Sequence, residues 1–179
     1  MSLPSGFTDD STHALPLYVL DRARLAEWRA AQAPDWAAAV LGVGDRSDAY
    51  AHAPLALPAD SNWRLAGSLS EEEQAALQLG WSLGSYRYTR YKQPTRLPAR
   101  LLATPDAEVR ALLEACVRVR DWVNTPAEDM GPEQLEAAAR MIADTHGTHG
   151  TQCDSIVGED LLIRNFPAIH AVGRAAHRG

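Results

Sequence analysis

The segment LPLYVLDRARLAEWRA, residues 15–30, contains a strand signal followed directly by a helix signal. Its first half, LPLYVL, is short and apolar, a pattern typical of a buried strand. Asp21 suits a helix N-cap, because its carboxylate can accept a hydrogen bond from a backbone N–H of the first turn. Leu25 and Trp28 then lie three residues apart on one helix face. The segment therefore predicts a buried strand and then an amphipathic helix over residues 22–31.

Length, charge and residue usage limit the class of protein. The chain has 179 residues, 46% of them hydrophobic and 22% charged, which suits one small domain with part of another. Its 23 acidic and 17 basic residues give a net charge of −6, which disfavours non-specific nucleic-acid binding. Cys116 and Cys153 are too few for a disulfide scaffold and indicate a reducing setting. With neither a secretory leader nor a membrane-length apolar run in this sequence, we expect a cytoplasmic protein without membrane contact.

The clearest helix signal begins at Ser70. Glu73 follows it at the spacing of a capping box, in which each side chain accepts a hydrogen bond from the other residue's backbone N–H. The helix predicted here directs Leu77, Trp81 and Gly84 inward. The glycine offers a flat position where a neighbouring backbone can approach closely.

The segment YRYTRYK, Tyr86–Lys92, alternates aromatic and basic residues. One interpretation is a nucleic-acid surface of stacking rings and phosphate-binding cations. The other is a helix end and strand whose tyrosines pack while the cations extend into water. Because the chain is acidic and has one such patch, we favour the second. Lys92 is also the only lysine of the chain, since every other basic residue is arginine.

Two less regular stretches flank these signals. A short helix is predicted after Pro34, using Trp36, Ala37 and Val40, before the chain extends again. Pro94–Pro105 has the composition of a linker, with several prolines and no sustained periodicity.

A long helix is expected after this linker. Thr104 suits its N-cap, with Pro105 at the first helical position. The inward positions share an apolar character at helical spacing, and they are Val109, Leu112, Leu113, Cys116, Val117 and Val123. The helix is long enough to bridge two domains.

Strand and helix signals alternate in the last third of the chain. Asn124–Pro126 ends the long helix, because the residue before a proline is pushed out of the helical region, and Gly131–Pro132 starts another. We then predict a strand over Thr151–Val157, a helical turn over Gly158–Asn165 and a strand over Ala168–Val172. This alternation is typical of a parallel α/β sheet, although two strands cannot cover both of their faces.

The histidines do not form a metal-binding motif. His146 and His149 lie three residues apart in a turn, whereas a zinc site needs three or four ligands. We interpret them as exposed turn residues. His170, in the apolar strand expected there, fits a core or interface histidine, and His177 lies farther along the chain.

Other reactive side chains also have simpler interpretations. The adjacent pairs Asp9–Asp10 and Glu128–Asp129 seldom direct both carboxylates at one substrate atom, so we favour solvated or capping roles, with Asp129 capping a turn. Cys116 on an inner helix face behaves as a small hydrophobic residue. The sequence also lacks a nucleophile elbow, a phosphate loop and a dinucleotide-binding fingerprint. We therefore predict no complete active site.

Three segments carry a resemblance to a known family. RDWVNTPAEDMGP, Arg120–Pro132, resembles the signature with which leucyl (cytosol) aminopeptidases pass from the inter-domain helix into the catalytic domain. IVGEDLLIRNFPAIHAVGRAA, Ile156–Ala176, is similar to the family's next stretch, which leads to a glycine-ended strand. LGWSLGSYRYTRYK, Leu79–Lys92, is similar to the end of its N-terminal domain. The first two occur in the family's order and separation.

The resemblance implies a metallo-exopeptidase that removes N-terminal residues from peptide substrates with two divalent metal ions, zinc or manganese. It also implies a hexamer built through the catalytic domains. The family's metal ligands and catalytic lysines come from G-K-G-x-x-F-D-[ST]-G-G and N-T-D-A-E-G-R segments, which this sequence lacks. No catalytic, metal-binding or substrate-binding residue is therefore carried over, and the single lysine, Lys92, lies elsewhere.

We therefore expect an α/β fold with three parts. Residues 1–104 form a small N-terminal mixed-sheet domain, residues 105–124 a linking helix, and residues 125–179 the truncated beginning of an α/β peptidase domain. We expect the chain alone to bind no metal, to be inactive and to serve oligomer geometry. The alternative is a non-catalytic regulatory or nucleotide- or DNA-binding module, and a third possibility is self-association through uncovered apolar faces.

Overall fold

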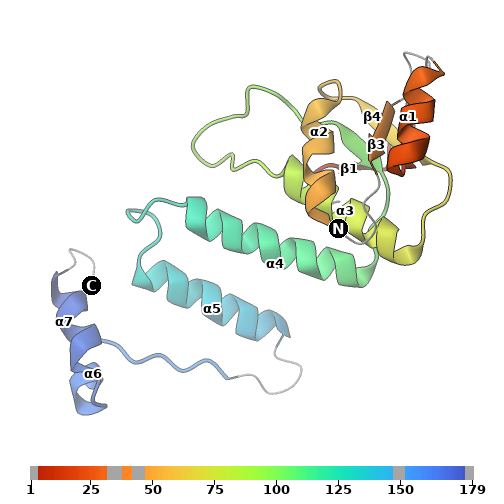
Figure 1. Ribbon diagram of the computed structural model, residues 1–179. Helices are drawn as coiled ribbons and strands as arrows, with labels where there is room; N and C mark the ends of the chain where they lie inside the picture. The colour runs from red at the N-terminus through yellow and green to blue at the C-terminus, as the bar shows by residue number, and fades with distance from the viewer. Residues whose placement is uncertain (1–3, 32–37, 42–46, 147–151, 176–179) are drawn as a thin grey trace. The chain divides into compact units, whose positions relative to one another are not determined.

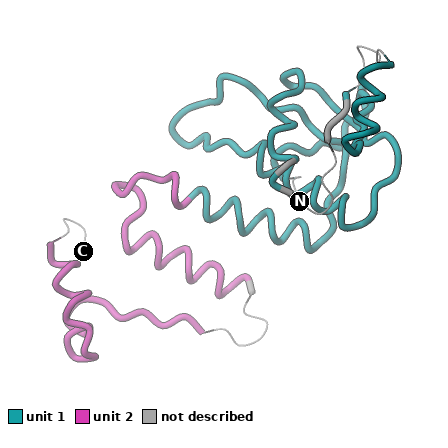
Figure 2. The backbone as a smooth tube through the Cα atoms, in the orientation of Figure 1, with its two compact units in different colours: residues 1–121 teal, residues 122–179 magenta. Residues whose placement is uncertain are grey.

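The chain divides into two compact units, which we call unit 1 (residues 1–121) and unit 2 (residues 122–179) (Figure 2). The computed structural model describes residues 4–31, 38–41, 47–146 and 152–175. The boundary between the units falls within helix α4 (Ala107–Asn124), near its C-terminal end. The three-part division expected from the sequence stays a prediction.

Unit 1 is built on a β-sheet (Figure 1). The sheet has five strands in the order β1-β5-β4-β2-β3. The α/β class predicted from the sequence is confirmed, and every strand pair is parallel, so the sheet is not mixed. The strands are β1 (Phe7–Thr8), β2 (Leu15–Leu20), β3 (Ala38–Leu41), β4 (Asn62–Ala66) and β5 (Arg100–Leu102).

The strand and helix predicted from LPLYVLDRARLAEWRA are both present. β2 is followed by helix α1 (Arg22–Ala30), and the Asp21 carboxylate accepts a hydrogen bond from the Arg24 N–H at 2.8 Å. The Tyr18 and Trp28 rings meet at 6.4 Å between centroids, joining the strand to its helix. Local capping and apolar spacing therefore predict this strand and helix correctly.

The prediction of a short helix that includes Val40 is wrong at that residue. Val40 lies in strand β3 and pairs with Val19 of β2. Its β-branched side chain suits a strand, and the parallel partner supplies the hydrogen bonds that a short isolated helix lacks. Pro34, Trp36 and Ala37 lie outside the described residues.

Helix α3 (Glu71–Ser85) begins as the capping box predicts. The Glu73 N–H donates to Ser70 Oγ at 3.2 Å, and the Ser70 N–H donates to a Glu73 carboxylate oxygen at 3.0 Å. Leu77 and Trp81 are buried in the core of unit 1, and the Trp81 indole N–H donates to the Ala99 carbonyl at 3.2 Å. The inward face of α3 is confirmed.

Gly84 of α3 meets the backbone of a neighbouring element. A Cβ atom at this position would lie 1.9 Å from the Ala51 carbonyl oxygen. This distance is too short for any side chain. Ala51 belongs to the 3₁₀ helix η1 (Ser47–His52), which continues into helix α2 (Ala53–Ala56). The close backbone approach predicted at Gly84 is therefore present.

The expected linker over Pro94–Pro105 contains an interior strand of the sheet. β5 lies between β1 and β4, with Leu101 opposite both Phe7 and Trp63. Leu101 is 2% exposed, and its backbone N–H donates to the Gly6 carbonyl at 2.8 Å. The hydrogen bonds of β5 come from β1 and β4, which are distant in sequence. No local periodicity predicts this strand.

Helix α4 starts later than expected. The Asp106 carboxylate, not Thr104, caps it by accepting a hydrogen bond from the Val109 N–H at 2.8 Å. Val109 and Leu113 are buried as predicted, whereas Leu112 is 47% exposed. The apolar positions of α4 therefore form two faces, of which one packs on unit 1's core.

Unit 2 contains helices α5 (Pro132–His146), α6 (Asp160–Ile163) and α7 (Pro167–Ala175). The start of α5 matches the sequence prediction, and α6 lies within the helical turn predicted over Gly158–Asn165. Both strands predicted here are wrong, because residues 152–157 form none and Ala168–Val172 lies within α7. Pro167 suits the first position of a helix, and no strand among the described residues of unit 2 offers a partner.

Candidate functional site

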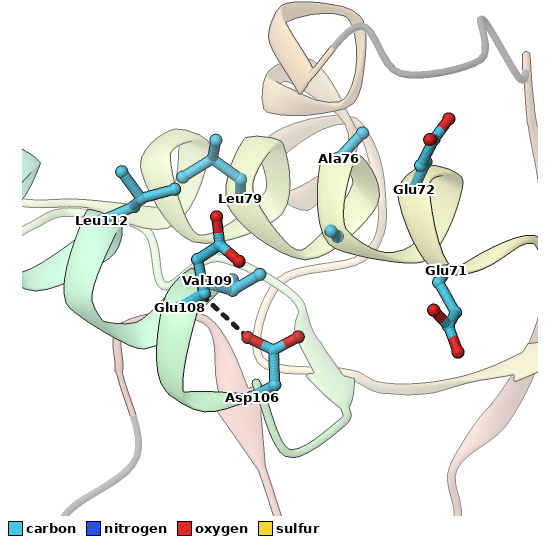
Figure 3. A pocket seen from close by; sticks show the side chains of 9 residues that line it. Glu71, Glu72, Ala76, Leu79, Asp106, Glu108, Val109 and Leu112 are labelled. Carbon is cyan, nitrogen blue, oxygen red and sulfur yellow. Dashed lines mark hydrogen bonds between the residues drawn. The ribbon is translucent and has the colours of Figure 1, made fainter.

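One hollow of unit 1 lies between the N-terminal halves of α3 and α4 (Figure 3). We call it the acidic groove, and it has a volume of about 520 Å³. Its walls combine carboxylates at one end with small and aliphatic side chains along the floor, and they are Glu71, Glu72, Ala75, Ala76, Leu79, Asp106, Glu108, Val109 and Leu112.

The four carboxylates of the acidic groove have a structural cause. Glu71 and Glu72 occupy the first turn of α3, Glu108 occupies the first turn of α4, and Asp106 caps α4. Acidic side chains stabilise the positive end of a helix. In Figure 3 the Glu71 and Glu72 carboxylates point in different directions and do not converge. The groove therefore presents negative charge without a built metal site.

A second hollow follows the same two helices farther along. We call it the apolar groove; its volume is about 380 Å³, and it is lined by Leu83, Ala115, Cys116, Val119 and Arg120. The Arg120 guanidinium donates to the Leu83 carbonyl at 2.6 Å and lies 5.4 Å from the centre of the Tyr86 ring. Arg120 is thereby held in place at this end.

Tyr86 and Asp121 extend this contact between the two helices. The Tyr86 hydroxyl donates to the Asp121 carboxylate at 2.7 Å. With the Arg120 contacts to the Leu83 carbonyl and the Tyr86 ring, this bond ties the C-terminal part of α4 to the end of α3. Among the residues that line the two grooves, no nucleophile stands beside a base.

The histidines considered from the sequence are not gathered at either groove. His146 is the last residue of α5, and His149 and His177 lie outside the described residues. His170 lies on α7, not in a strand, with Nε2 3.3 Å from a Glu159 carboxylate oxygen. Within the described residues, no three His, Cys, Asp or Glu side chains are arranged to hold a metal ion.

One residue of each acidic pair makes a hydrogen bond to a residue two or three positions away. The Asp10 carboxylate accepts a hydrogen bond from the Thr12 N–H at 2.9 Å, and its hydrogen bonds with Thr12 lower the pKa of Asp10. The Asp129 N–H donates to the Pro126 carbonyl at 2.8 Å within a turn. The absence of catalytic residues from the whole chain stays a prediction.

Two arginines after α3 donate hydrogen bonds to backbone carbonyls. Residues 86–92 form neither helix nor strand, so the strand expected there is wrong. Arg87 donates to the Gly84 carbonyl at 3.1 Å, and Arg96 donates to the Leu55 and Leu57 carbonyls. Contacts of this kind favour the packing interpretation over a surface for phosphates.

Sequence reasoning missed the grooves themselves. Each is made by two helices that are separated by strand β5 and by the Tyr86–Lys92 segment. One local signal was available, since Asp106 stands three residues before Val109 at the spacing of an N-cap. The pairing of α3 with α4 has no such local signal.

Comparison with known proteins gives matches to aminopeptidases. Residues 31–105 match the family model described as M17 aminopeptidase, N-terminal domain. Peptidase B of Pectobacterium carotovorum is 42% identical over 66 residues, which are 34% of this chain and 14% of that protein. Peptidase B of Yersinia pseudotuberculosis is 36% identical over 80 residues, 45% of this chain and 18% of that protein. These matches support a similarity between this chain and the N-terminal portion of the leucyl aminopeptidase family.

The resemblance read from the sequence, to the N-terminal portion of the leucyl aminopeptidase family, is confirmed. The fold agrees: the cytosol aminopeptidase of Coxiella burnetii superposes with a TM-score of 0.63 at 21% identity, covering 79% of this chain and 38% of that one. The chain therefore spans under a fifth of the curated relatives that it matches and about two fifths of the solved one. Among the described residues, no helix has the length and apolar character needed to cross a membrane.

Proposed function

We propose that this chain forms the N-terminal part of a cytoplasmic leucyl aminopeptidase that removes N-terminal residues from peptides. In this proposal the chain contributes structure and oligomer geometry, and a following catalytic domain contributes the chemistry. The observation that carries it is the match of residues 31–105 to the M17 aminopeptidase N-terminal domain. The parallel sheet of unit 1 and its agreement in fold with a cytosol aminopeptidase support it.

The residues that the structure describes do not fit the metal centre that the family implies. Two divalent ions, zinc or manganese, need several converging carboxylate or histidine ligands. No such group occurs among the described residues. In the acidic groove, the Asp106 carboxylate caps α4, and the Glu71 and Glu72 carboxylates point in different directions. We therefore assign no catalytic step to this chain, and expect the metals to bind to the catalytic domain.

The architecture of unit 1 supports a structural role. Its core is closed by its own sheet and helices, with Leu17, Trp81 and Leu113 all 0% exposed. Such a unit keeps its shape without a partner domain. In a hexamer held together by catalytic domains, we propose that it sets the outer geometry and the access of peptides to the active site.

Hydrolysis of leucine p-nitroanilide tests this proposal. We expect the 179-residue chain to show no turnover with added manganese or zinc, whereas a parent protein that includes both family metal segments turns over and loses activity with a chelator. Turnover by the chain itself would contradict its structural role. A parent that carries both segments and stays inactive with either metal would contradict the aminopeptidase assignment.

A further inference from the structure

A further hollow of unit 1 lies where strands β4 and β5 lead into helices α3 and α4. We call it the polar hollow, and it has a volume of about 320 Å³. The residues that line it are Glu71, Gln74, Ala75, Gln78, Thr104 and Asp106. Because β4 and β5 are parallel neighbours, both connections leave the sheet at the same edge, beyond the carboxyl ends of the strands. Open α/β sheets bind their ligands at this edge.

One buried side chain of the polar hollow has no hydrogen-bond partner. Gln78 is 5% exposed, and its carboxamide makes no hydrogen bond with any residue that the structure describes. It follows Glu71 and Gln74 along α3 at spacings of three and four residues, which places all three on the face that lines the hollow. A buried amide without a hydrogen bond is unfavourable. A ligand in the hollow would supply the missing bond.

The charge of the polar hollow indicates a cationic ligand. The carboxylates of Glu71 and Asp106 border it, and its lining contains no basic residue. Figure 3 shows the Glu71 carboxylate on the same side of α3 as Asp106, whereas Glu72 points to the opposite side. The positive ends of α3 and α4 offset about half an elementary charge each. About one negative charge therefore remains for a ligand to neutralise.

Size and chemistry favour an organic cation over a metal ion. The volume of the polar hollow is several times the roughly 30 Å³ that a water molecule occupies in the liquid. Among the described residues, no three His, Cys, Asp or Glu side chains are arranged to hold a metal ion. A guanidinium presents five N–H donors in a planar fork, which suits carboxylate and amide oxygens, whereas an ammonium presents three from one compact centre. The guanidinium of arginine is therefore the group that fits.

We propose that the polar hollow binds the side chain of an arginine residue in a peptide. The guanidinium donates hydrogen bonds to the carboxylates of Glu71 and Asp106 and to the carboxamide oxygen of Gln78. Both carboxylate residues also line the acidic groove, so the two hollows adjoin. The aliphatic floor of the acidic groove includes Leu79 and Leu112. This floor suits an apolar side chain next to the arginine, which makes the ligand a peptide.

Titration of the 179-residue chain with acetyl-arginyl-leucinamide, followed by NMR, tests the proposal. The side-chain amide resonances of Gln78 should shift and saturate, and the affinity should fall as ionic strength rises. The acetyl group blocks the free amino end on which an exopeptidase acts. Acetyl-citrullyl-leucinamide replaces the guanidinium with a neutral group and should bind roughly tenfold more weakly. Acetyl-lysyl-leucinamide should bind about threefold more weakly, because an ammonium has fewer donors.

Four variants separate ligand binding from folding. Gln78→Met keeps the length of the side chain and removes the amide, so the affinity should fall about fivefold while the free energy of unfolding is equal or higher. Asp106→Asn keeps an oxygen to cap α4 and removes the charge, so the affinity should fall roughly tenfold. Glu71→Gln should have a similar effect. Glu72→Gln is the matched control, since Glu72 lies in the same helical turn but does not line the polar hollow.

Five outcomes would overturn the proposal. They are no binding of the arginyl peptide, equal binding of the citrullyl peptide, an unchanged affinity in Gln78→Met, equal effects of Glu71→Gln and Glu72→Gln, and displacement of the peptide by calcium chloride. Equal binding of argininamide would overturn the role of the peptide, because the neighbouring apolar side chain would then add nothing. The inference does not depend on aminopeptidase activity. An inactive parent protein would remove the proposed function while leaving this site in place, and a chain that does not bind the arginyl peptide would do the reverse.

Discussion

Leu17, Trp81 and Leu113 of unit 1 are 0% exposed, whereas Ile163, Ile169 and Val172 of unit 2 are 80%, 59% and 74% exposed. Both units contain amphipathic helices, so periodicity alone does not explain the difference. Unit 1 has a parallel sheet on which its helices pack. The described part of unit 2 has helices only. An apolar helix face thus becomes a core only where a second layer covers it.

Removing a large side chain should show the largest difference in stability between the two units. Trp81→Ala deletes a fully buried ring and its hydrogen bond to the Ala99 carbonyl, so unit 1 should lose about 3–5 kcal/mol of unfolding free energy. Ile163→Ala in unit 2 should change stability by less than about 0.5 kcal/mol. Urea denaturation followed by circular dichroism measures both. Equal losses would contradict the contrast in burial.

The same glycine-to-alanine change should have opposite effects in the two units. Gly84→Ala forces a methyl group against the Ala51 carbonyl and should destabilise unit 1 by about 1–3 kcal/mol. Gly173→Ala meets no atom within 4 Å and should favour helix α7 by up to about 1 kcal/mol. Urea denaturation measures the first, and far-ultraviolet circular dichroism of helix content measures the second. A neutral Gly84→Ala variant would be incompatible with the close approach.

Loss of the capping box tests how far local sequence stabilises unit 1. Ser70→Ala removes the acceptor for the Glu73 N–H and should cost about 1 kcal/mol of unfolding free energy. Ser68→Ala is the matched control, since Ser68 is exposed and precedes the helix. The difference between the denaturation midpoints of the two variants measures the contribution of the cap to stability. Identical midpoints would show that tertiary contacts alone hold the start of α3.

Titration of α5 should give the smallest effect. In unit 2 the Arg140 guanidinium lies 2.8 Å from the Glu136 carboxylate, and its hydrogen bond, followed by one from Ser155, lowers the pKa of Glu136. Because this pKa is lowered on folding, the contribution of the pair is present above the ordinary pKa of glutamate and is lost as pH falls through the folded value. NMR titration should show the Glu136 pKa rising in Arg140→Gln. An unchanged pKa would rule out this pairing in solution.

Prediction from the sequence succeeded where a few neighbouring residues contain the whole signal. Asp21 and Ser70 each cap a helix through residues three positions ahead, and Pro132 begins α5. It failed for β5 and β3, which looked like a linker and a helix. Their hydrogen-bond partners lie in strands far along the chain, so no local pattern reports them.

The C-terminal segment shows the opposite error. Residues 168–172 are apolar enough to suggest a strand, yet they form part of α7. A short apolar run fits either structure, and the choice depends on whether a strand partner is present. In the described part of unit 2 no partner strand is present, and the helix satisfies its own backbone hydrogen bonds.

The sequence by itself determined the α/β class, the helix caps, the close approach at Gly84 and the resemblance to the leucyl aminopeptidase family. These follow from short-range hydrogen bonding, backbone geometry and segments read in order. Only the tertiary structure decided the parallel strand order, the insertion of β5 and the two grooves between α3 and α4. Those features join residues that are distant in the chain, and their energy comes from packing and pairing that no single segment contains.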